Sequence, residues 1–124
     1  MSQLTVLETA VGVALPDELK SLLRESNGVL GAYGLRLIWS AEEITQRNVK
    51  MRTDSTFLHS YMPFENLLFF ADAGNGDQFA LRIIQGVIGR PDIFVWNHED
   101  DSRTWAAPSL KHYLEWWLTG KLKV

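Results

Sequence analysis

The sequence has no cysteine, and that absence excludes a disulfide framework, a thiol nucleophile and a cysteine-ligated metal. It also lacks an excess of basic residues. Its 12 lysines and arginines stand against 15 aspartates and glutamates, which leaves a formal net charge of −3. Nucleic-acid-binding domains usually carry a basic stripe, so this balance argues against direct binding to nucleic acid. A mildly acidic chain suits a basic protein partner instead.

Long hydrophobic runs are missing as well. No window approaches the roughly 20 apolar residues that a membrane-spanning helix needs. The N-terminal segment has neither a basic start nor a long apolar core, so no signal peptide is expected. We therefore expect a cytoplasmic protein with no membrane association. Its 124 residues, 46% of them hydrophobic, suit a single domain over residues 1–124 that buries a core without cross-links.

The most informative stretch is LLFFADAGNGDQFALRI, at residues 67–83. It begins with a continuous apolar run at 67–71, continues through a polar turn with glycines at 72–77, and ends in a strict alternation of apolar and other residues at 78–83. This order predicts two paired strands joined by a structured loop. The first strand should be buried on both faces, because it contains no polar residue, and the second should be half-buried.

The rest of the chain follows helix and strand patterns in an order that predicts an α+β fold. Strands that follow one another with short polar turns favour an antiparallel meander, and helices at the N-terminal and C-terminal ends should pack mainly on one of its faces. Helices are expected over residues 2–11, from Leu15-Pro16 to Asn27-Gly28, from a capping box at 40–43 to about Met51, and from Pro108-Ser109 to Gly120. Further strands are expected over residues 35–39, 93–96 and 103–107. Residues 52–63 and 84–91 are expected to be connections.

Five tryptophans are many for so short a chain. Large aromatic rings dominate the apolar cores of proteins, so Trp96, Trp105 and Trp117 are expected inside, and Trp39 in the core or at its rim. Trp116 lies off the apolar stripe of the last helix. It is therefore a candidate for a partly exposed anchor of a binding surface.

Four motifs, in order, carry a resemblance to a known family. They are the helix from Leu15-Pro16 to Asn27-Gly28, the glycine-rich loop from Phe70 to the Gly-Asp pair at 76–77, the strand and turn FVWNHE at 94–99, and the helix start APSL at 107–110. In this order the sequence resembles the SUKH superfamily of Smi/Knr-like proteins over nearly its whole length. The resemblance implies an α+β domain without enzymatic activity.

The same resemblance implies a protein partner. In bacteria it implies an immunity protein that binds and neutralises a cognate polymorphic toxin, which is often a nuclease. In other branches it implies an interaction module, with fungal cell-wall regulators among the examples. The alternative function is therefore a regulatory or scaffold domain that binds another protein.

The turn at 72–77 has two interpretations. It is either an acidic loop that faces a partner or a turn that stabilises itself, with Gly74 and Gly76 at positive φ and Asp72, Asn75 and Asp77 bonded to nearby backbone. A calcium loop is disfavoured, because the spacing lacks the EF-hand register and its later glutamate.

The densest acidic cluster is His98-Glu99-Asp100-Asp101. Adjacent residues on one turn cannot all point at one metal ion, and an exposed turn does not split two carboxyl pKa values for acid–base catalysis. In a meander this turn shares an end of the sheet with the turn at 72–77. Together the two loops could form an acidic patch that attracts a basic toxin.

No catalytic, cofactor or metal-binding residues are assigned. Ser109 and His112 lie on one helix, but no motif such as G-x-S-x-G surrounds the serine, so a small hydrolase is the least favoured hypothesis. Serine there is better interpreted as a helix-start residue. The apolar connection at 84–88 would permit a weak homodimer if it is exposed, and otherwise a monomer is expected.

Overall fold

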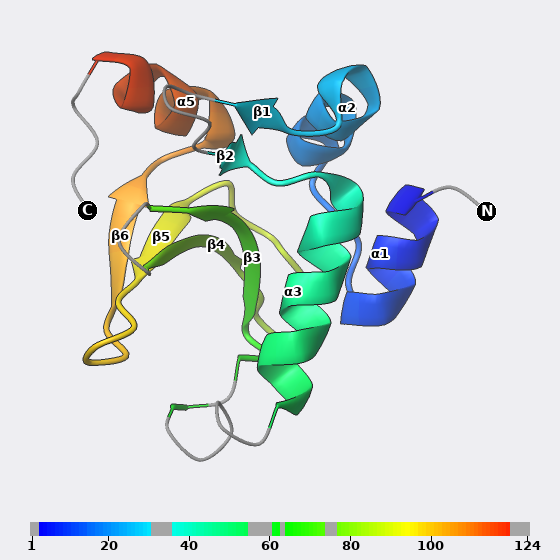
Figure 1. The fold of residues 1–124 in the computed structure, drawn as a ribbon, viewed down its shortest axis with the longest axis vertical. Helices are drawn as coiled ribbons and strands as arrows, with labels where there is room; N and C mark the ends of the chain where they lie inside the picture. The colour runs from blue at the N-terminus through cyan, green and yellow to red at the C-terminus, as the bar shows by residue number, and fades with distance from the viewer. Residues whose placement is uncertain (1–2, 31–35, 55–60, 63, 74–76, 120–124) are drawn as a thin grey trace.

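The structure is a computed structural model that describes residues 3–30, 36–54, 61–62, 64–73 and 77–119. Gly74, Asn75 and Gly76 of the predicted loop lie outside the described residues. Along the chain the elements are α1 (Gln3–Val11), α2 (Asp17–Ser26), β1 (Val29–Leu30), β2 (Arg36–Ile38), α3 (Ala41–Thr53), β3 (Leu67–Asp72), β4 (Gln78–Arg82), β5 (Ile93–Trp96), β6 (Arg103–Ala107) and α5 (Leu110–Thr119), as Figure 1 shows.

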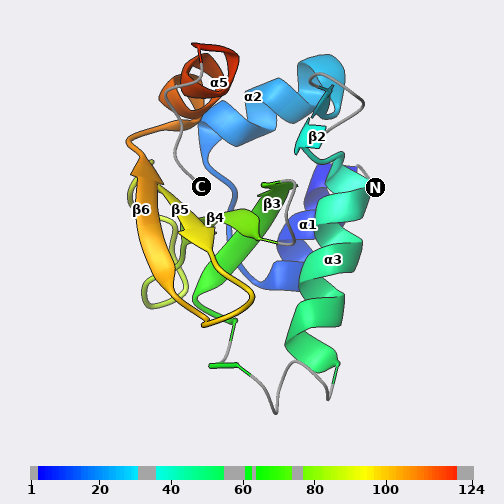
Figure 2. The same cartoon turned by 60° about the vertical axis from the view of Figure 1, so that its left-hand side comes forward.

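The predicted α+β class with an antiparallel meander is confirmed. Strands β3, β4, β5 and β6 form one sheet in that order, and each is antiparallel to the next. Strands β1 and β2 form a separate two-stranded antiparallel sheet. The helices of the described part of the chain gather above and to one side of the four-stranded sheet in both views (Figures 1 and 2).

The predicted hairpin of β3 and β4 forms, but the expectation that β4 is half-buried is wrong, because Phe79, Ala80 and Leu81 are all buried. Strand β3 is buried along its length except for half-buried Asp72, and β4 exposes only Arg82. The sequence does not predict β1, because a strand of two residues cannot show an alternation. That short strand pairs with β2 just after Gly28, whose φ is +117°. A side chain at this position would bring its Cβ to 3.0 Å from the carbonyl oxygen of Ile38.

The outer edge of β3 is closed by side chains and by one backbone group. The amide of Asn48, on α3, donates to the carbonyl of Phe69 at 2.8 Å and accepts from the N–H of Phe69 at 2.9 Å. Arg52 donates to the carbonyl of Leu67 at 3.1 Å, and the N–H of Trp39 donates to the carbonyl of Phe70 at 2.8 Å. An exposed edge would be free to pair with another strand, and these bonds prevent that at β3.

One face of the sheet is covered by α5. The ring of Tyr113 lies edge-on to Phe70 and Phe79, with centroids 5.4 and 4.9 Å away, and Phe79 also contacts Trp117. The Tyr113 hydroxyl donates to the carbonyl of Leu37 at 2.7 Å, which ties β2 to the same face. Burial raises the pKa of this hydroxyl above its ordinary value. Helix α5 is therefore fixed by packing and by one buried hydrogen bond.

The other face is covered over only part of its area. Tyr61, Phe64, Phe69 and Trp96 form an aromatic cluster there, with ring centroids 5.0–5.8 Å apart. Trp105 is 49% exposed, so its predicted place in the core is wrong. It lies on β6, the last strand of the sheet, where Trp116 of α5 covers only part of its ring. Trp39 and Trp96 are in the core, as predicted.

Candidate protein-binding site

The two predicted loops meet at one end of the sheet, as the meander requires. Asp77, only 5% exposed, ends the first loop, and His98 begins the second. The carboxylate of Asp77 accepts from the N–H of His98 at 3.1 Å, and the same Oδ1 lies 2.6 Å from the Nδ1 of His98. The carbonyl of Asp77 also accepts from the N–H of Ala73 at 2.9 Å. Asp77 thus anchors both loops, and little of it faces solvent.

Asp72 is also turned towards the protein. Its Oδ2 accepts from the indole N–H of Trp39 at 2.9 Å, and the guanidinium of Arg47 lies 4.7 Å above the Trp39 ring. This arrangement links the end of β3 to α3 through a tryptophan that is fully buried. The Asp72 carboxylate satisfies a buried donor there, as the desolvation of an indole N–H requires.

Asp101 is the centre of a hydrogen-bond network beneath the second loop. It accepts from the indole N–H of Trp96 at 2.7 Å, the N–H of Met62 at 2.9 Å and the guanidinium of Arg103 at 3.2 Å. Burial alone would raise the pKa of Asp101, but these donors and the charge of Arg103 hold it below its ordinary value. The carboxylate therefore stays ionised and holds the segment around Met62 against the sheet.

Glu99 and Asp100 are the acidic residues of this loop that are exposed. The Asp100 carboxylate accepts from the N–H of Ser102 at 2.9 Å, and this bond holds the pKa of Asp100 below its ordinary value. The N–H of Glu99 donates to the side chain of Asn97 at 2.8 Å, so the turn is held by its own polar groups. The structure therefore leaves two carboxylates facing solvent at the tip of the loop, on a rigid base.

Trp116 is half-buried and lies apart from these loops. Its ring is 6.2 Å from Trp105 and 6.0 Å from His112, both edge-on. Trp116 on α5 and the exposed Trp105 on β6 thus form a pair of rings at the edge of the sheet. The sequence singled out Trp116, but nothing in it marked Trp105 as the more exposed partner.

Ser109 begins α5, as the sequence predicts. Its hydroxyl accepts from the N–H of His112 at 3.2 Å and lies 2.9 Å from the Nδ1 of the same histidine. Within the described residues, no carboxylate is hydrogen-bonded to the other nitrogen of that ring. The contact between Ser109 and His112 is therefore explained by Ser109 capping the N-terminus of α5.

The described residues contain no group of three histidines, cysteines, aspartates or glutamates placed to hold a metal ion. Among the described helices, none has the length and apolar character to cross a membrane.

Comparison with protein families supplies the decisive observation. The family model SUKH_6, described as SMI1-KNR4 cell-wall, matches residues 2–114. The chain belongs to the SUKH family. This confirms the resemblance that the four ordered motifs indicated. Searches of curated proteins and of solved structures return no match to this SUKH chain.

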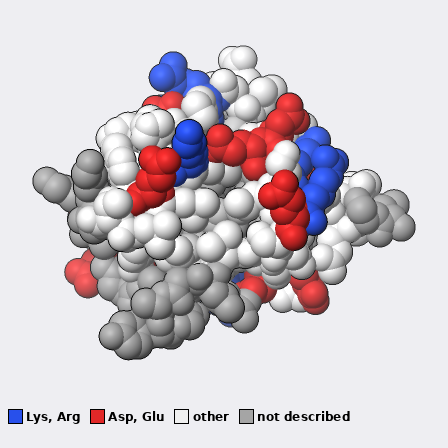
Figure 3. Space-filling model, turned by 90° about the horizontal axis from the view of Figure 1, so that it is seen from above, with Lys and Arg blue, Asp and Glu red and all other residues white. Residues whose placement is uncertain are grey.

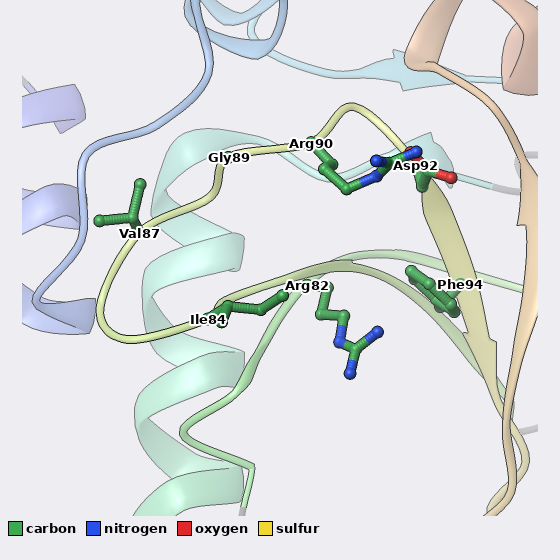
Figure 4. Close-up of a pocket in the computed structure, with 7 residues that line it drawn as sticks. All are labelled: Arg82, Ile84, Val87, Gly89, Arg90, Asp92 and Phe94. Carbon is green, nitrogen blue, oxygen red and sulfur yellow. The ribbon is translucent and has the colours of Figure 1, made fainter.

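The SUKH chain also has a surface feature that the sequence indicated only in part. A pocket of about 270 Å³ lies between the connection that follows β4 and the face of the sheet (Figure 4). The apolar connection at 84–88 was the available signal, and Ile84 and Val87 in it are indeed 53% and 60% exposed. The sequence could not indicate that the same surface would include Arg82 and Phe94, because that follows from the pairing of β4 with β5.

Proposed function

We propose that this SUKH protein is a non-enzymatic immunity protein that acts in the cytoplasm by binding and neutralising a cognate toxin. The observation that carries the proposal is the family match over residues 2–114. The geometry of the second loop supports a binding role, because Glu99 and Asp100 are exposed on a turn that is held by its own polar groups.

The partner proposed for this site is a basic toxin domain, such as a nuclease that must bind phosphate. Glu99 and Asp100 would face it, while Asp72, Asp77 and Asp101 hold the loops in position. Charges at the rim of an interface raise the rate of encounter more than they raise affinity. By contrast, the face seen from above, over α2 and α5, carries acidic and basic side chains close together (Figure 3), so it gives a partner no field of one sign.

A co-expression experiment tests the proposal. Reading frames encoded next to this protein are screened for toxicity, any toxic one is expressed in cells with and without this protein, and growth is measured. The native protein should restore growth. If neither growth rescue nor binding to the purified toxin is seen, the immunity function is wrong.

Charge reversal tests the loop separately. Glu99→Lys with Asp100→Lys should slow association with the toxin about tenfold at low salt, and the difference should shrink as salt is added. The matched control is Glu25→Lys with Glu115→Lys, two exposed glutamates elsewhere on the surface. If both double variants associate equally fast, the loop does not face the partner.

A regulatory interaction domain is the second candidate, since the family description itself names the cell wall. It predicts a protein partner in the host cell and no rescue from a neighbouring toxin. The two candidates therefore differ in the outcome of the same co-expression experiment.

A further inference from the structure

The pocket beside the connection between β4 and β5 is lined by apolar side chains and rimmed by charged ones. Figure 4 shows the chain from Ile84 to Asp92 looping around it, while Arg82 and Phe94 project from the two strands that the loop joins. Its volume is about 270 Å³, near the small end of ligand sites, so it has room for single side chains more readily than for a cofactor.

A rigid turn presents two of the apolar side chains. Ile84 and Val87 exchange both backbone hydrogen bonds, at 2.9 and 3.1 Å. The residues between them, Gln85 and Gly86, have φ values of 51° and 76°, as a type I′ turn requires. Positive φ is unfavourable for glutamine, so the turn forms at a conformational cost. Ile84 and Val87 are therefore held in place before any partner arrives, which lowers the entropy lost on binding.

The sheet supplies the side of the pocket that faces this turn. Phe94 on β5 pairs with Trp105 on β6, so the two rings share a face, and Arg82 lies two residues beyond Ala80, the partner of Phe94 on β4. Trp105 is half exposed, and its indole N–H donates to Asp92 at 2.9 Å. Exposed apolar groups gathered on one surface and surrounded by charged residues are typical of a binding site.

The charges of the rim are not balanced. The carboxylate of Asp92 is already shared, since it accepts from Trp105 and from Arg90, the latter at 3.3 Å. Arg82 is exposed, its guanidinium lies 5.9 Å from the Phe94 ring, and the described residues offer it no carboxylate. The rim therefore carries two guanidinium groups against one carboxylate. Its charge complements an anion beside an apolar group.

From this geometry we infer that the pocket is the docking site for a protein segment that presents a large apolar side chain next to a carboxylate. The apolar side chain would enter between Ile84, Val87 and Phe94, and the carboxylate would pair with Arg82. The inference rests on the proposed function only in requiring a protein partner, and it does not require that partner to be a toxin.

A pair of synthetic peptides tests the docking site. Both are eight residues long with a central phenylalanine, flanked in one by glutamates and in the other by lysines. They are titrated into the ¹⁵N-labelled full chain and followed by amide and indole NMR signals. The glutamate peptide should shift the signals of Val87 and the Trp105 indole and bind at least tenfold more tightly than the lysine peptide. Equal binding of both peptides, or no shift at the pocket at millimolar peptide, overturns the inference.

Variants make the test specific. Arg82→Glu should weaken binding of the glutamate peptide at least tenfold and reverse the preference, so that the lysine peptide binds better. Arg24→Glu, a charge reversal on α2 away from the pocket, is the matched control and should change neither peptide. Both substituted side chains are exposed, so a native-like spectrum is expected for each. If the glutamate peptide still binds the Arg82→Glu variant as before, the inference is wrong.

Two further outcomes are distinguishable. Shifts at Val87 and Trp105 that grow with protein concentration in the absence of peptide would show that a second copy of this chain occupies the pocket, and would overturn the inference. Growth rescue by co-expression is measured separately, so failed rescue with intact peptide binding removes the immunity function and leaves the docking site. Growth rescue without peptide binding rules out the docking site and leaves the immunity function.

Discussion

At the scale of single residues, Asn48 closes the edge of the sheet with one side-chain amide. It is 1% exposed and bonds both the N–H and the carbonyl of Phe69, while also donating to the carbonyl of Ile44 at 2.7 Å. A neighbouring strand would normally satisfy these groups of Phe69. Here a helix lies in that place, so the asparagine acts for the missing strand.

Asn48→Leu should therefore be strongly destabilising. It keeps a similar volume but leaves the buried N–H and carbonyl of Phe69 without partners, which should cost about 2–4 kcal/mol of unfolding free energy. Urea denaturation measures this. Gln46→Leu, an exposed position on the same helix, is the control and should change stability by less than about 0.5 kcal/mol. Equal effects of the two variants would mean that water replaces the amide at the edge.

Asp101 gives a prediction on pH. A carboxyl whose pKa is lowered by folding stabilises the protein above its unfolded pKa, near 3.9, and that contribution is lost as the pH falls through the lower folded value. Asp101→Asn should thus cost about 1–3 kcal/mol at pH 6, and the difference from the native protein should shrink below about pH 4. Urea unfolding at a series of pH values measures it. A difference that stays constant down to pH 2 would contradict the ionic role of this network.

At the scale of elements, the turn between Ile84 and Val87 places a glutamine at positive φ. Gln85 adopts φ of 51° although glutamine disfavours it, while Gly86 at 76° fits the turn without strain. The dipeptide Asn-Gly is the sequence that a type I′ turn prefers. One substitution would therefore convert this turn into its favoured form.

Gln85→Asn should raise the unfolding free energy by about 0.5–1 kcal/mol, because asparagine tolerates positive φ better than glutamine. The melting temperature of the variant measures this. Gln85→Ala is the matched control, since alanine removes the side chain without easing the backbone, and it should give no gain. If alanine stabilises as much as asparagine, backbone strain at this turn is not the cause.

The elements also show where sequence reasoning succeeds and where it stops. The alternation in β4 and the capping box before α3 are local signals, and the Glu43 N–H does donate to the Ser40 hydroxyl at 3.2 Å. The exposure of Trp105 is not local, because it depends on β6 being the last strand of the sheet and on which helices cover each face. Whether a carboxylate is free or bonded is likewise decided by donors far along the chain. Asp101, for example, bonds the backbone of Met62.

At the scale of the whole molecule, one hydrophobic core connects both ends of the chain. Its buried members run from Leu7 on α1 to Tyr113 on α5 in a single cluster. Helix α1 reaches the sheet through α3, which lies beside the outer edge of β3, and α5 covers one face of the sheet. No described element buries its apolar side chains in a separate core, and the edge bonds of Asn48 join the helical layer to the sheet. This continuity favours a single domain.

Folding as a single domain predicts one cooperative unfolding transition. Four of the five tryptophans lie on the sheet or on α5, so tryptophan fluorescence reports mainly on these parts, whereas far-ultraviolet circular dichroism is dominated by the helices. Coincident curves from the two would show that these parts unfold together. A heat-capacity increment of about 1.5–1.9 kcal/mol/K is expected for 124 residues unfolding as one unit. Asn48→Leu sharpens the test, because it loosens the contact between α3 and the sheet. In one domain it should lower both midpoints equally, whereas two separate domains would let fluorescence and dichroism move apart.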